Sequence, residues 1–184
     1  MLKVKAEALA FAAHFIGDIS QPLHASNFAL GGNHIYAKFL GYAGSKSDAE
    51  FHTNMHFIWD ISVPQKQIAT EFGGSWDKWV DALEANGAAA GPVTGVQCAQ
   101  TVDPTDFLAV RKCVDSWAIE SDILTCDVVF KNGGEAALPF LDKKNDPNQI
   151  DLSGDYYAAV KSVVDQQIYR GGIRLAAFLN NIFQ

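Results

Sequence analysis

Two histidine–aspartate pairs are the residues in this sequence best suited to bind a metal ion. Asp18 follows His14 by four residues, and Asp60 follows His56 by four residues. On an α-helix this spacing places both side chains on one face, about 6 Å apart along the axis. Imidazole and carboxylate groups are ligands of zinc in catalytic sites that keep an open coordination position. Both pairs have apolar neighbours, so we expect these side chains to be buried and to need polar partners.

A third histidine, His24, follows a turn at Pro22 and lies between the two pairs. His14, His24 and His56 are three of the five histidines, and together with the two aspartates they predict ligands for more than one metal ion. The alternative for each histidine taken alone is a core side chain bonded to the backbone. The absence of a nearby cysteine argues against a closed, cysteine-rich structural site.

The remaining histidines are not predicted to be ligands. Asp48 and His52 continue the four-residue spacing of His56. We expect them on a solvated face or in contact with the ligands rather than with the metal ion. Position 53 is threonine, so the helix motif of metalloproteases is not met. His34 has no partner in the sequence pattern and is expected to be structural.

Length and composition indicate one globular domain over residues 1–184. Hydrophobic residues make up 48% of the chain and charged residues 19%. No apolar run reaches the roughly 18 to 20 residues of a membrane span, and the first residues show no signal-peptide pattern. The net charge of −7 argues against a protein that grips duplex DNA through its phosphates. It does not exclude a nuclease, because bound zinc would supply positive charge locally.

The hydrophobic pattern predicts an all-α protein with long loops. We expect helices over about 2–19, 48–60, 64–83 with a break at glycines 73–74, 104–130, and 153–183, with an irregular segment over 20–47 and a short strand within 35–40. Loops are expected at 85–92 and 131–152. Pro104 and Ser153 are the expected starts of the last two helices.

Buried tryptophans and small residues are the expected packing features of these helices. Trp76, Trp79 and Trp117 are predicted to lie in the core. Gly171 and Gly172 are predicted to allow close contact between helices.

Several segments combine into one recognisable pattern. It reads HFxGDxxQPLH over 14–24, Gly-Gly-Asn over 31–33, and NxHxxWD over 54–60. This pattern resembles the zinc-dependent single-strand-specific nucleases of fungi and plants, the nuclease S-one and P-one family. The segments WAxES at 117–121, Cys126 and GIRLA at 172–176 are also similar to that family, so the resemblance covers nearly the whole chain. It implies a multi-helix fold of the phospholipase C and zinc nuclease type.

The resemblance implies three zinc ions in one cleft. His14 and Asp18 would serve the first zinc, and Asp18, which is also the expected catalytic residue, would bridge to the second. His24, His56 and Asp60 would hold the third, more separate zinc. The implied reaction is hydrolysis of phosphodiester bonds assisted by the metal ions.

The same resemblance implies a substrate pocket and a setting. Leu30, Gly31 and Asn33 match residues that contact the nucleobase, with Leu30 as an apolar wall. Single-stranded DNA, RNA and the 3′-phosphates of nucleotides are the implied substrates. We expect a secreted monomer that does not associate with membranes.

The sequence also departs from the family pattern. The family's upstream zinc ligands have no counterpart, since residues 1–13 contain no His, Asp, Trp or Cys. We therefore expect one complete zinc site, formed by His24, His56 and Asp60, and an N-terminal segment of the family that is missing here. Two alternatives stay open, namely a helical zinc-binding fragment without catalysis and a zinc phospholipase C.

The cysteines fit the same resemblance. Cys98 and Cys113 could pair with each other, and Cys126 matches a family cysteine whose partner lies upstream. Disulfides would imply an oxidising, secreted setting. The loop around residues 41–50 is longer than the resemblance implies, and we assign it no function.

Overall fold

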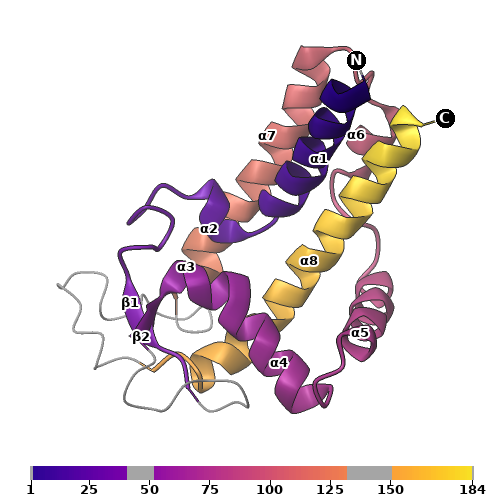
Figure 1. Ribbon diagram of the computed structural model, residues 1–184. Helices are drawn as coiled ribbons and strands as arrows, with labels where there is room; N and C mark the ends of the chain where they lie inside the picture. Colours follow the sequence, from indigo (N-terminus) through magenta and orange to yellow (C-terminus); the bar gives the residue numbers. More distant parts are fainter. Residues whose placement is uncertain (1, 41–51, 132–150, 184) are drawn as a thin grey trace.

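The computed structural model describes residues 2–40, 52–131 and 151–183 (Figure 1). Its elements in chain order are α1 (Leu2–Asp18), α2 (Pro22–Ala25), β1 (Tyr36–Lys38), β2 (His52–Asn54), α3 (Met55–Phe57), η1 (Ile58–Ser62), α4 (Val63–Glu71), α5 (Trp76–Ala89), α6 (Val96–Thr101), α7 (Phe107–Leu124), η2 (Thr125–Val129) and α8 (Asp155–Ile182). The segments η1 and η2 are π-helical turns that continue the helices before them. The predicted all-α class is confirmed, since the described residues add only one two-stranded sheet.

The long helix α8 is the element on which the others pack. It contacts α1, α4, α5 and α6, and α1 runs antiparallel beside its C-terminal half (Figure 1). Gly171 of α8 is buried, and a Cβ built there would lie 3.0 Å from the Ser20 hydroxyl. The predicted close packing at Gly171 is therefore confirmed, whereas Gly172 has no atom within 4 Å of such a Cβ.

Two main clusters of buried residues hold these elements together. The larger one joins α2, strand β1 and the α3–η1 segment to α8 through residues that include Leu23, Met55, Trp59 and Val160. The smaller one joins α1, α6, α7 and α8 around Trp117. A disulfide between Cys98 and Cys113 links α6 to α7 within this second cluster, which confirms the predicted pairing.

The small sheet sets the start of the helix that carries His56. β1 and β2 are antiparallel, with Tyr36 opposite Asn54. The Met55 amide donates to the Ile35 carbonyl at 2.8 Å. The Asn54 side chain then accepts from the Phe57 amide at 2.8 Å and caps α3.

The predicted helix over 48–60 is wrong at its described N-terminal end. His52–Asn54 is a strand, and helical structure begins only at Met55. Pairing with β1 satisfies the backbone of these residues, and Asn54 is suited to a cap rather than a helix interior. Asp48 and the loop at 41–50 lie outside the described residues.

Other boundaries also differ from the predictions. Helix α5 continues to Ala89 through the expected loop, and α6 was not predicted. Helix α7 starts after Asp106, whose carboxylate accepts from two backbone amides, and not at Pro104. Helix α8 starts at Asp155 after Gly154, so Ser153 is not its N-cap.

The tryptophan predictions were correct for two of three residues. Trp79 and Trp117 are buried, whereas Trp76 is 58% exposed. Trp76 is the first residue of α5, at the end of the helix, where its side chain does not face the core.

None of the described helices is both long enough and apolar enough to cross a membrane.

Candidate metal site

The short helix α2 positions His24. Gln21 caps it by accepting a hydrogen bond from the Leu23 amide, and Pro22 occupies the first turn, where its missing N–H costs nothing. Thr125 of η2 donates to the Pro22 carbonyl at 2.8 Å. Leu23 is 1% exposed in the main core. These contacts fix α2 so that His24, in its last turn, faces the α3–η1 segment.

The α3–η1 segment positions His56 and Asp60. Its π-helical turn is closed by a hydrogen bond from the Val63 amide to the Ile58 carbonyl and contains Asp60. Trp59 is buried and donates to the hydroxyl of Tyr156 at 2.8 Å. Because Trp59 is held from the core side, its neighbour Asp60 is directed toward His24. Turns of this wider kind are frequent at functional sites.

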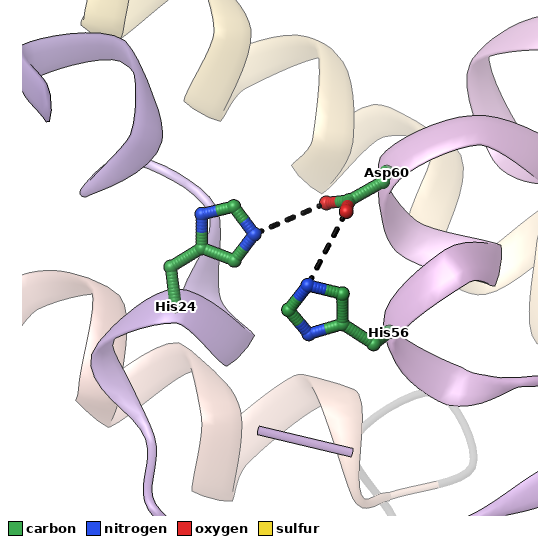
Figure 2. A group of neighbouring side chains, drawn as sticks. All are labelled: His24, His56 and Asp60. Atoms are coloured by element: carbon green, nitrogen blue, oxygen red, sulfur yellow. Dashed lines mark ion pairs between the residues drawn. The ribbon is translucent and has the colours of Figure 1, made fainter. Parts of the chain in front are cut away.

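His24, His56 and Asp60 converge as a group of possible metal ligands (Figure 2). Asp60 Oδ1 lies 3.3 Å from His24 Nε2, and Asp60 Oδ2 lies 3.3 Å from His56 Nε2. One donor atom from each residue lies within 4.8 Å of the others. The two imidazole rings stack, with centroids 4.8 Å apart. Two imidazoles and one carboxylate match the three-ligand sets of open zinc sites, so this group could hold a metal ion.

A side-chain amide and a backbone carbonyl contact Asp60 and His56 and orient their side chains. Gln21 Nε2 donates to Asp60 Oδ1 at 2.9 Å. The carbonyl oxygen of Gly31 lies 2.8 Å from His56 Nδ1. Partners of this kind set the orientation and tautomer of metal ligands. The role of Gln21 is not predicted from the sequence, although its place immediately before Pro22, in a capping position, is a usable signal.

The electrostatics of the site favour an ionised carboxylate. Burial raises the pKa of Asp60, but hydrogen bonds from His24 and Gln21 outweigh it and keep this pKa below its ordinary value. The hydrogen bond to Asp60 raises the pKa of His24, against an opposing effect of burial, and the charge of Asp18 adds to the rise. Only a neutral imidazole ligates a metal, so an incoming ion would compete with the proton on His24.

Asp18 lies beside this group but is not one of its three converging members. Asp18 Oδ1 is 2.9 Å from His24 Nδ1. That nitrogen is buried without a hydrogen-bond partner among the described residues, so the contact is electrostatic and lies off the N–H direction. His14 Nε2 is 4.0 Å from Asp18 Oδ1. The structure therefore places His14 and Asp18 near His24. Among the residues it describes, no third donor joins this pair to form a second group of possible metal ligands.

The expected burial of His14 is wrong, since its side chain is 66% exposed. Its apolar neighbours Phe11 and Phe15 are themselves 59% and 58% exposed, so the apolar run does not mark a buried face. The expectation for His56 is partly met, because its side chain is 24% exposed.

A shallow depression adjoins the three possible ligands, and two of the three predicted substrate-binding residues line it. Leu30 and Gly31 line it together with His24 and His56. Asn33 does not line it, and its side chain donates to the Leu30 carbonyl at 2.9 Å. Asn33 thus supports the shape of this loop.

A second, apolar cavity of about 490 Å³ lies between α1 and α7, and Asp18 and His24 border it.

Comparison with known proteins supplies the family. The family model described as "S1/P1 Nuclease" matches residues 2–184. The chain belongs to the S1/P1 nuclease family. The resemblance in the sequence pattern is thereby confirmed, and a nuclease family is consistent with a helical chain in which two histidines and an aspartate could hold a metal ion.

Curated relatives of the S1/P1 nuclease family align over almost all of this chain. It is 34% identical to Nuclease PA3 of a Penicillium species over 180 residues and 33% identical to Nuclease P1 of Penicillium citrinum over 177 residues, with 96% of the chain covered in each case. It is 32% identical to Nuclease S1 of Aspergillus oryzae, with 95% covered. The aligned parts make up 58%, 58% and 54% of these relatives, so the chain spans little more than half of their length.

Proposed function

We propose that this chain provides a zinc site of a nuclease that hydrolyses phosphodiester bonds in single-stranded DNA and RNA. The proposed activity includes removal of 3′-phosphates from nucleotides, and the proposed role is breakdown of nucleic acids outside the cell. The observation that carries the proposal is the convergence of His24, His56 and Asp60 in a chain of the S1/P1 nuclease family. The disulfide between α6 and α7 supports a secreted setting.

The proposed roles follow from the donor set. His24, His56 and Asp60 would hold zinc, which acts as a Lewis acid on phosphate and activates water for hydrolysis. The open depression beside them would admit the substrate, with Leu30 and Gly31 as its wall. Its mixed lining suits a nucleoside, whose base is flat and apolar on its faces and polar at its edges.

His14 and Asp18 are proposed as ligands of further zinc ions, with Asp18 as the catalytic residue. They supply only two donors, which lie 4.0 Å apart. Zinc normally takes at least three protein ligands. Further ions would therefore need donors beyond these two, and this chain alone is expected to bind about one zinc ion tightly.

The first test is zinc per chain, measured by elemental analysis on metal-saturated and desalted protein. We expect about one ion. A value near three would mean that further donors complete the sites of His14 and Asp18, and no bound zinc would refute the proposed metal site. Hydrolysis of single-stranded DNA should be assayed on the same sample, with a chelator-treated sample as the control.

A second candidate is a zinc-binding protein without catalysis. The incomplete donor set at His14 and Asp18 favours it, because it leaves two of the expected ions without a full set of ligands. One tightly bound zinc together with no turnover of single-stranded DNA would support this candidate. A zinc phospholipase C is tested in the same assay with phosphatidylcholine vesicles, and the family match argues against it.

A further inference from the structure

The loop that follows α2 contains a backbone turn of unusual handedness. Residues 29–32 have successive φ angles of 49°, 53°, 60° and 81°. Within the described part of the chain, Ala29 and Leu30 are the only residues other than glycine with positive φ. The left-handed conformation is costly for residues that carry a Cβ, and it rarely persists for more than one residue. Such strain is retained where the surrounding structure holds it, often at functional sites.

Hydrogen bonds on both sides hold this left-handed turn. The Gly32 amide donates to the Phe28 carbonyl at 3.1 Å, and the His34 amide donates to the Ala29 carbonyl at 3.1 Å. The Asn33 side chain donates to the Leu30 carbonyl. The carbonyls of Phe28, Ala29 and Leu30 are thus engaged within the loop itself.

The carbonyl of Gly31 has a different partner. Its oxygen lies 2.8 Å from His56 Nδ1, across 25 residues of sequence. A side chain at this position is excluded, because a Cβ on Gly31 would lie 2.6 Å from the Leu23 carbonyl oxygen at a φ of 60°. The turn therefore brings a bare backbone carbonyl against the imidazole that faces Asp60.

A carbonyl oxygen only accepts hydrogen bonds, so His56 must carry its proton on Nδ1 to donate to Gly31. Nε2 is then left for a metal ion on the side of Asp60. An acceptor behind a ligating histidine fixes both its tautomer and the angle of its ring.

We propose that the Gly31 carbonyl is a positioning group for His56 and that the left-handed turn of residues 29–32 exists to hold it there. The inference rests on the proposed metal site. It adds that the wall of the substrate depression, formed by Leu30 and Gly31, and the orientation of a metal ligand depend on one backbone conformation. Gly31 acts through His56 and is not itself a metal ligand.

The first experiment compares Gly31→Ala with Gly73→Ala. Gly73 has nearly the same φ, 61°, but no atom lies within 4 Å of a Cβ built there. Zinc dissociation constants should be measured by competition with a chromophoric chelator, and thermal unfolding of the metal-free proteins should verify that both are folded. We expect zinc affinity to fall about 10- to 100-fold in Gly31→Ala and to stay unchanged in Gly73→Ala. A folded Gly31→Ala protein with wild-type zinc affinity would overturn the inference.

The second experiment needs no variant and therefore does not depend on how Gly31→Ala folds. Wild-type protein labelled with nitrogen-15 is loaded with cadmium-113 and studied by NMR. We expect the His56 Nε2 resonance to show coupling to cadmium and Nδ1 to carry the proton. Coordination through Nδ1 would refute the positioning role while leaving the metal site in place. A wild-type protein that binds neither zinc nor cadmium would refute the metal site and the inference together.

Discussion

Gln21 joins the two segments of the candidate metal site by a hydrogen bond of 2.9 Å from its Nε2 to Asp60 Oδ1. The other end of the same amide accepts from the Leu23 amide at the start of α2. Because the oxygen must face this backbone N–H, the amide cannot rotate without losing both bonds. The residue that begins the helix of His24 thereby also orients the carboxylate on the opposite segment.

Gln21→Ala should therefore weaken zinc binding by about 10-fold or more, as is common when a group behind a metal ligand is removed. The variant also loses a helix cap, which is worth about 1 kcal/mol. Ser75→Ala is the matched control, since Ser75 caps α5 by accepting from Lys78 at 3.3 Å and lies outside the metal site. Chelator competition should show reduced zinc affinity for Gln21→Ala alone. Equal zinc affinity in the wild type, Gln21→Ala and Ser75→Ala would show that Gln21 does not support the metal site.

Asp60→Asn should lower the zinc content by about one ion per chain. The amide keeps the size of the side chain but lacks the negative charge that the site stabilises. Asp115→Asn is the control, because Asp115 is exposed on α7 and pairs with Arg111. Elemental analysis of desalted samples gives the zinc content directly. Unchanged zinc in Asp60→Asn would disprove its assignment as a ligand.

Tyr156→Phe should destabilise the protein by about 3 kcal/mol, because two buried partners lose their hydrogen bonds. The Tyr156 hydroxyl accepts from Trp59 at 2.8 Å and donates to the Val129 carbonyl at 2.9 Å. Urea unfolding of the metal-free protein measures the loss, with Tyr36→Phe, at a residue that is 48% exposed, as the control. Since Trp59 adjoins Asp60, we also expect weaker zinc binding. A change in stability equal to that of the control would show that the hydroxyl is not important.

Glu71 should make stability depend on pH in the acid range. Burial raises the pKa of Glu71, but hydrogen bonds from Lys161 and Tyr157 outweigh it, so the folded-state pKa lies below the ordinary value of 4.5. The stabilisation is therefore complete above about pH 4.5 and is lost as pH falls through the folded-state pKa.

Glu71→Gln should lower stability at neutral pH and flatten the decline of stability on acidification. Urea unfolding of the metal-free proteins at several pH values tests this, with Glu84→Gln on α5 as the control. A Glu71→Gln profile parallel to that of the wild type would contradict the assigned interaction with Lys161 and Tyr157.

Features within one or two helical turns could be predicted from the sequence. The spacing of His56 and Asp60 determined that both point to one side, and the side chains lie 3.3 Å apart at their nearest donor atoms. The same spacing placed His14 near Asp18, but the predicted burial of His14 was wrong because burial depends on which elements cover α1. Local spacing determines direction, whereas exposure depends on the neighbouring elements.

The sequence by itself determined the types of the candidate metal ligands, the mainly helical class and the family pattern from which the site residues were predicted. The resemblance already grouped His24, His56 and Asp60, and only the tertiary structure decided which other residues hold them in place. The Gln21–Asp60 bond spans 39 residues and the Gly31–His56 bond spans 25. Both depend on how α2 and the loop after it pack on the α3–η1 segment. No periodicity encodes such contacts, because they arise from burial of Leu23, Met55 and Trp59 in one core and from a left-handed turn that local preferences oppose.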